Sequence, residues 1–204
     1  MCRAYAHGVA GNWSRARARA RIEVICAEFH DDRSLRLQVL AVLGEVIDFD
    51  AYVWLLTDPV TAVGVAPLAD VPCLPELPAL IRAKYATTVN RWTTLRRQSS
   101  PAGTLSRATG GDLSRSLMWR TVLSRYGIGD VASAVFADQF GCWGFLDLWR
   151  SDTSDPFSAA DAGLIAAVAA PLATALRQCQ ARTLRRSRDS APARSRTGRP
   201  DGRR

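Results

Sequence analysis

Histidine is scarce in this sequence, which contains only His7 and His30. Neither has a second His, a Cys or a carboxylate at metal-ligand spacing within the predicted core strands. His7 also lies in a segment without hydrophobic periodicity. A metal or haem site and a catalytic triad built on His are therefore poorly supported, and the sequence indicates no cofactor.

Cysteine is present only as isolated residues. The five are an odd number, widely spaced and without a C-x-x-C pair: Cys2, Cys26, Cys73, Cys142 and Cys179. This pattern argues against a disulfide framework, a zinc site or a redox motif. We expect thiols that pack as small hydrophobic groups in a reducing compartment.

Long apolar runs are also absent. The longest, from Ala162 to Leu176, contains Pro171 and Thr174 and falls short of the roughly 20 residues that a membrane span needs. The N-terminus has no uninterrupted apolar segment typical of a secretory signal. The sequence therefore predicts a soluble, cytoplasmic protein without a membrane partner.

Positive charge is concentrated at the C-terminus. The net charge of the chain is +8, but residues 182–204 hold nine Arg against Asp189 and Asp201, a net of +7, which leaves +1 for residues 1–181. The segment has no aromatic residue and is rich in Arg, Ser, Pro and Gly, so we predict a disordered tail over 183–204. Three interpretations stay open: a solvated end, a nonspecific nucleic-acid contact, and the product of an altered reading frame.

Hydrophobic periodicity begins at Ile22, and we expect a flexible segment over 1–21 before a single domain over 22–182. The predicted elements begin with a helix from Ile22, a helix capped by Ser34, strands over 49–56 and 61–65, and a helix from Pro75. They continue with a helix that residues 109–112 introduce and that runs to about Arg125, strands over 131–138 and 142–150, and a long helix opened by a capping box at Ser158 and Asp161 and distorted at Pro171. Strands grouped in pairs favour an α+β fold with an antiparallel sheet. The terminal helices would cover one face, and loops and short helices the other.

Two groups of motifs, taken in their order, carry a family resemblance. The first comprises Ile47-Asp-Phe-Asp-Ala-Tyr-Val-Trp54 and Ala108-Thr-Gly-Gly111. The second comprises Trp143-Gly-Phe-Leu-Asp-Leu-Trp149, Pro156-Phe-Ser-Ala-Ala-Asp161 and the helix from Leu164 to Leu172. Together they resemble a GAF domain of the kind found before the helix-turn-helix of actinobacterial LuxR-type regulators.

The resemblance covers about residues 22–182 and implies a ligand-sensing domain that modulates transcription. Two features depart from the family. The segment 185–204 has almost no apolar residues from which to build a helix-turn-helix, and the Asn-Lys, Phe, Asp-Glu series of cyclic-nucleotide-binding GAF domains is not recognisable. A cyclic nucleotide is therefore not predicted.

Aromatic residues on the predicted strands suggest a binding site. Alternation places Phe49, Ala51, Val53 and Leu55 on one face of their strand and Tyr52 and Trp54 on the other, and it separates Leu146 and Leu148 from Trp143, Phe145 and Asp147. We expect the small aliphatic face to pack on the terminal helices and the aromatic face to line a pocket under residues 66–126. The candidate ligand-binding residues are Tyr52, Trp54, Trp92, Trp119, Trp143, Phe145 and Asp147. The alternative is that these aromatics fill a second core.

Asp147 interrupts an apolar strand, and a buried carboxylate needs a partner. An Arg from the covering region is one interpretation of that partner, and a ligand is the other.

The leading functional interpretation is a non-catalytic sensory domain that binds an unknown small molecule, with homodimerisation through its terminal helices. One alternative is an enzyme similar to the GAF-fold reductases of free methionine sulfoxide, for which Cys73 and Cys142 would be the candidate thiols. Another is a non-functional remnant of a regulator that has lost its output domain.

Overall fold

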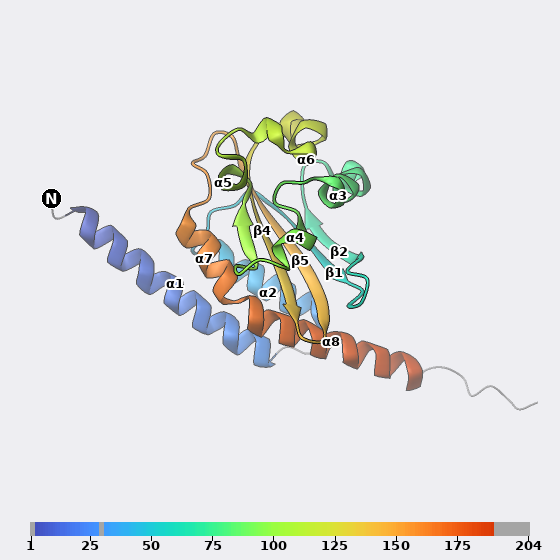
Figure 1. Cartoon of the computed structure of the whole chain (residues 1–204). Helices are drawn as coiled ribbons and strands as arrows, with labels where there is room; N and C mark the ends of the chain where they lie inside the picture. Colours follow the sequence, from blue (N-terminus) through green and yellow to red (C-terminus); the bar gives the residue numbers. More distant parts are fainter. Residues whose placement is uncertain (1–2, 29–30, 190–204) are drawn as a thin grey trace, which may run out of the picture.

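The computed structural model describes residues 3–28 and 31–189 of the 204-residue chain. Its centre is one five-stranded sheet in the order β2-β1-β5-β4-β3, in which every pairing is antiparallel. The strands are β1 (Ala51–Thr57), β2 (Gly64–Asp70), β3 (Ala102–Thr104), β4 (Ile128–Asp138) and β5 (Gly141–Ser151). Helices cover both faces (Figure 1). The predicted α+β, GAF-like architecture is confirmed.

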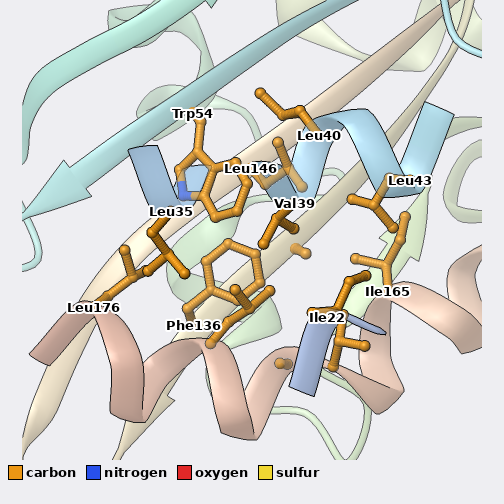
Figure 2. Close-up of a cluster of buried hydrophobic side chains, with 14 of the residues drawn as sticks. Ile22, Leu35, Val39, Leu40, Leu43, Trp54, Phe136, Leu146, Ile165 and Leu176 are labelled. Carbon is orange, nitrogen blue, oxygen red and sulfur yellow. The ribbon is translucent and has the colours of Figure 1, made fainter. Parts of the chain in front are cut away.

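One face of the sheet carries the terminal helices (Figure 1). They are α1 (Arg3–Glu28), α2 (Asp32–Gly44), α7 (Ala159–Ala167) and α8 (Ala169–Asp189). Their buried residues, such as Ile22, Leu35 and Ile165, form one hydrophobic cluster with the facing strand residues Phe136 and Leu146. Figure 2 shows this cluster, which we call the helix-face core.

The other face is covered by short helices and loops between β2 and β4. They are η1 (Leu74–Glu76), α3 (Leu77–Ala86), α4 (Trp92–Leu95), α5 (Leu105–Thr109), η2 (Leu113–Arg115), α6 (Leu117–Thr121) and η3 (Leu123–Tyr126). Buried residues of this layer, including Leu80 and Leu123, pack on Val53, Val131 and Phe145 of the sheet and form a second cluster, the cover-face core.

Helical structure extends further at both ends than the sequence pattern indicates. Instead of a flexible segment over 1–21, the described residues from Arg3 onward belong to α1, in which Ala18 is buried. Arg15 reaches α7, where its Nη2 lies 2.7 Å from Oδ1 of Asp161. At the other end α8 continues to Asp189, so residues 183–189 are helical, while the rest of the predicted tail, 190–204, lies outside the described residues.

The turn before β2 corrects one predicted strand. The Asp58 carboxylate accepts hydrogen bonds from the backbone of Val60 and from the backbone and hydroxyl of Thr61. These side-chain contacts hold residues 58–63 as a loop, as Asp commonly does in turns. The strand predicted over 61–65 therefore begins at Gly64.

The middle of the chain differs most from the prediction. The helix expected to run to about Arg125 is divided into η2, α6 and η3, because the backbone leaves the helical conformation at Ser116 (φ −86°, ψ 123°) and at Val122 (φ −130°, ψ −62°). Strand β3 was not predicted. By contrast, the capping box of Ser158 and Asp161 is present, and the last helix breaks before Pro171 into α7 and α8, which bend by 42°.

No single helix in the described part of the chain is long and apolar enough to cross a membrane, although the bent pair α7 and α8 passes that test by combined length and composition.

Candidate functional site

Four of the seven predicted site residues lie on the cover face of the sheet. Trp92 of α4 stacks on Phe145 of β5 with ring centroids 4.8 Å apart and planes 6° from parallel. The Trp92 indole N–H donates to Oδ1 of Asp147 at 2.9 Å, and Trp119 donates its own to the backbone carbonyl of Ile128. Trp92, Phe145, Asp147 and Trp119 therefore belong to one layer.

Asp147 has a cationic partner from that layer, but it is a lysine rather than the expected arginine. Nζ of Lys84, on α3, lies 3.2 Å from Oδ1 of Asp147, and both side chains are at most 1% exposed. The same ammonium donates to Oγ of Ser133 at 2.6 Å, and Asn90 Nδ2 donates to that oxygen at 3.0 Å. Burial lowers the pKa of Lys84 below its ordinary value, although Asp147 opposes this shift.

The other three predicted residues lie on the opposite face, so the expected grouping is wrong for Tyr52, Trp54 and Trp143. All three pack in or against the helix-face core, where Figure 2 shows Trp54 beside Phe136. For Trp143 the cause is an irregularity in β5. Cys142 pairs with Ala137 and Gly144 with Phe136, which leaves Trp143 as an extra residue and reverses the alternation there.

The space expected to form an aromatic pocket is filled by protein. Trp92, Phe145 and Trp149 are all 0% exposed and belong to the cover-face core. The alternative in which these aromatics build a second core therefore describes the structure better. Trp92 occupies the position above Phe145 and Asp147 that a ligand would have taken.

A pocket of about 1190 Å³ lies instead at the β3 edge of the sheet, and none of the seven predicted residues lines it. Its walls come from β3, the segment 88–98 that contains α4, the α5 region, and the start of α7 with Pro156 and Phe157. We call it the edge pocket. Asn90 lines it and also contacts Ser133, so the pocket adjoins the buried Lys84–Asp147 cluster.

Asp130 of β4 holds two walls of the edge pocket together. It is 1% exposed. Its carboxylate accepts hydrogen bonds from the backbone and hydroxyl of Ser106 and from the backbone of Val131 and Phe157, at 2.7–2.9 Å. Ser106 and Phe157 belong to opposite walls, so this buried acid fixes α5 against the loop that leads into α7.

The lining of the edge pocket is basic. Arg91, Arg107 and Arg115 line it, and no Asp or Glu does. Sequence reasoning missed these arginines because residues 66–126 were interpreted only as a cover. A signal was present: residues 88–120 contain six Arg and a single acid, Asp112, a local excess hidden by the net +1 of residues 1–181.

Residues 3–28 and 31–189 were also compared with what a metal site or a reactive thiol requires. No group of three or more His, Cys, Asp or Glu side chains in these ranges is arranged to hold a metal ion. Cys73 and Cys142 are buried thiols, and burial is the main cause that raises the pKa of each above the ordinary thiol value.

No protein-family model matches the chain, and no curated protein matches it. Among solved structures, the chain is similar to a GAF domain/HD domain protein from Geobacter sulfurreducens, with 14% identity, a TM-score of 0.46, and coverage of 80% of this chain and 94% of that one. It is also similar to CepR2 from Burkholderia cenocepacia, described as an N-acylhomoserine-lactone-dependent LuxR family transcription factor, with 15% identity, a TM-score of 0.49, and coverage of 86% and 99%.

Proposed function

We propose that this chain is a sensory or regulatory domain that binds a small molecule in the edge pocket. The observation that carries the proposal is the pocket itself, a concave site of about 1190 Å³ between β3, α4, α5 and α7. Binding sites for small molecules are usually concave, with an apolar lining and a few placed polar groups. Apolar residues such as Val89 and Leu95 share this lining with Asn90 and the three arginines.

The proposed role is binding without catalysis. The thiols of Cys73 and Cys142, which the reductase alternative would require, are buried and have raised pKa values. A thiol that stays protonated is a poor nucleophile. These features favour a sensor over that enzyme.

Gly163 offers a test of the pocket. It lies in α7 at the pocket wall, and a Cβ built on it would have no atom within 4 Å. The variant Gly163→Phe should place a ring in the part of the pocket beside α7, whereas Gly163→Ala should leave that part open. We expect fragments from a library of mixed charge to shift backbone amide resonances of pocket residues in the natural protein and in Gly163→Ala, and to shift those beside α7 less in Gly163→Phe.

Two outcomes would contradict the proposal. One is a library that shifts no pocket amide in the natural protein. The other is a set of shifts that survives unchanged in Gly163→Phe, because the fragments would then bind elsewhere.

We further propose that the domain acts in transcriptional regulation as a homodimer through α1 and α8. These helices pack together on the helix face, and Trp13 and Val24 of α1 are 74% and 54% exposed. Such apolar exposure supports a helix-to-helix contact between copies. Sedimentation equilibrium should give twice the chain mass, and a monomer mass at every concentration tested would overturn the dimer.

The link to a DNA-binding output, the actinobacterial origin and a nucleic-acid contact by the tail stay predictions.

A further inference from the structure

The arginines of the edge pocket have no acidic partners among the residues that the structure describes. No salt bridge involves Arg91, Arg107 or Arg115 within the described ranges 3–28 and 31–189. Arg115 donates one hydrogen bond, from Nη1 to the backbone carbonyl of Thr109 at 3.0 Å. Three guanidinium groups therefore share one concave surface without a compensating charge.

Arg91 is the most informative of the three. Its side chain is half-buried, and its Nε is buried without a hydrogen-bond partner. A buried donor without an acceptor is costly, and the cost is larger for a charged group. A guanidinium presents a planar set of donors that fits a carboxylate or a phosphate. The Nε is closed to solvent, so an anion in the open pocket would contact the terminal nitrogens of the Arg91 guanidinium instead.

Asp130, a buried acid beside the pocket, does not act as an acceptor for the three arginines. The Asp130 carboxylate contacts Ser106 and Phe157 of the pocket walls, and its four hydrogen bonds come from backbone N–H groups and one hydroxyl. It accepts none from the three arginines. Its negative charge holds the walls in place, while the lining itself stays positive.

The rest of the lining indicates what kind of anion fits. Val89, Leu95, Ala102 and Phe157 give the pocket an apolar side. A bare inorganic ion would leave this surface in contact with water, whereas an organic body would bury it. The volume of about 1190 Å³ leaves room for such a body.

We infer that the edge pocket recognises an organic anion, with an apolar body against the Val89 and Leu95 side and a carboxylate or phosphate group against Arg91, Arg107 and Arg115. This inference rests on the proposed function and specifies its ligand class. Arg91 makes the central contact, and Arg107 and Arg115 add positive charge at the rim.

Three probes of one shape test the charge requirement: naphthalene-2-carboxylate, its neutral amide, and 2-naphthyl phosphate. Binding to the full chain is measured by titration of amide resonances at constant ionic strength. We expect both anions to shift pocket amides, and the neutral amide to bind at least about tenfold more weakly because it cannot form charge-assisted contacts with the guanidinium groups. The anion that binds more tightly then shows whether the pocket prefers a carboxylate or a phosphate group.

Arginine variants locate the contact. We expect Arg91→Gln to weaken the anions by about tenfold or more, and Arg107→Gln to weaken them by less, because Arg107 is exposed. Arg97→Gln is the matched control, since Arg97 belongs to the same basic segment but does not line the pocket. It should change the affinity less than about twofold. Thermal unfolding of each variant confirms that it is folded.

The outcomes separate the two proposals. If the neutral amide binds the pocket as tightly as the anions, or if Arg91→Gln and Arg107→Gln both leave anion binding unchanged, the anion inference is overturned while the pocket remains a binding site. If no probe of either charge shifts a pocket amide, the ligand-binding function assigned to the pocket fails with it.

Discussion

Lys84 and Asp147 place two opposite charges in the interior of the cover face. The attraction between two buried opposite charges offsets the large cost of removing both from water. If one partner is removed, the other charge stays buried and unpaired. Here Lys84 donates a hydrogen bond to Ser133, which also accepts one from Asn90, and Trp92 donates to Oδ1 of Asp147. The cluster joins α3, α4, β4 and β5, so its effect on stability should depend on both charges together.

A double-mutant cycle should reveal this dependence. Lys84→Met alone is expected to lower the free energy of unfolding by about 3–5 kcal/mol, because the Asp147 carboxylate loses its cation in a fully buried site. Adding Asp147→Asn should recover part of that loss, since the neutral amide keeps an acceptor for Trp92. Urea unfolding measures each variant. Strict additivity of the two single losses would contradict the prediction.

The cysteines make a second prediction at this scale. Burial, with smaller contributions from Cys179 and Glu23, raises the pKa of Cys26 to about 12, and Cys73, Cys142 and Cys179 are also buried with raised pKa values. Since the thiolate is the reactive form, iodoacetamide at pH 8 should leave these four thiols unmodified in the native protein. In urea all four should react. Peptide mass spectrometry distinguishes them, and rapid native labelling of any of the four would contradict the prediction.

At the residue scale, the alternation of side chains along the strands assigned some residues to the correct face of the sheet and others to the wrong one. It correctly separated Leu146 from Phe145 and Asp147, and it identified Asp147 as a buried acid in need of a partner. It failed at Trp143, because an extra residue in β5 reverses the alternation. It also placed Tyr52 and Trp54 on the wrong layer, since period-two alternation shows which residues share a face but not which helices cover that face.

At the scale of elements, some glycines lie so close to a neighbouring backbone segment that any side chain there should destabilise the fold. A Cβ on Gly141, at the β4–β5 turn, would lie 2.7 Å from the carbonyl oxygen of Pro59, and this oxygen also accepts the N–H of Cys142. We expect Gly141→Ala to cost about 1–3 kcal/mol of unfolding free energy. Gly163→Ala, in the open interior of α7, should instead add about 1 kcal/mol. Urea unfolding measures both variants. Changes of the same sign in the two unfolding free energies would contradict the assignment.

The contact between α1 and α7 should depend on pH. Burial alone would raise the pKa of Asp161, but hydrogen bonds from Arg15 and Ser158 hold it below its ordinary value. An acid with a depressed folded-state pKa contributes stability above its unfolded pKa of about 3.9, and this contribution is lost as the pH falls through the folded value.

Arg15→Gln is therefore expected to lower the unfolding free energy at pH 7 by about 1.5 kcal/mol, and the difference from the natural protein should shrink as the pH falls below the unfolded-state pKa of about 3.9. Arg19→Gln, which removes an exposed pair with Glu23, is the control and should cost only about 0.3–0.5 kcal/mol. Urea unfolding between pH 2 and 7 measures both. A loss for Arg15→Gln that does not change with pH would contradict the assignment.

Elements with strong local signals were predicted well, and those set by tertiary contacts were not. The capping box of α7 and the paired strands β4 and β5 follow from residues next to one another in the chain. Strand β3 has only three residues, from Ala102 to Thr104, and exists through its pairing with β4. No local pattern of that length identifies a strand. The edge pocket, which β3 helps to form, was therefore not predictable.

The distribution of charge links these observations across the whole molecule. Residues 1–181 are nearly neutral, yet residues 88–120 hold six Arg and one Asp, and the fold brings three of those arginines to one pocket. Several arginines elsewhere are paired with acids, as Arg15 with Asp161 and Arg177 with Asp138. The uncompensated positive charge at the edge pocket supports the proposal that it is a binding surface.

If the folded domain binds an organic anion and the unfolded chain does not, the anion should stabilise the whole molecule. At a free concentration of ten times Kd, mass action contributes about 1.4 kcal/mol, which corresponds to roughly 3–6 °C in Tm for a domain of this size. At the same concentration, tenfold weaker binding contributes only about 0.4 kcal/mol, so the rise with 2-naphthyl phosphate should fall to less than about a third for its neutral analogue 2-naphthol and in Arg91→Gln, and it should persist in Arg97→Gln. Scanning calorimetry at fixed ionic strength measures it. An equal rise in Arg91→Gln would mean that the anion stabilises the protein from outside the pocket.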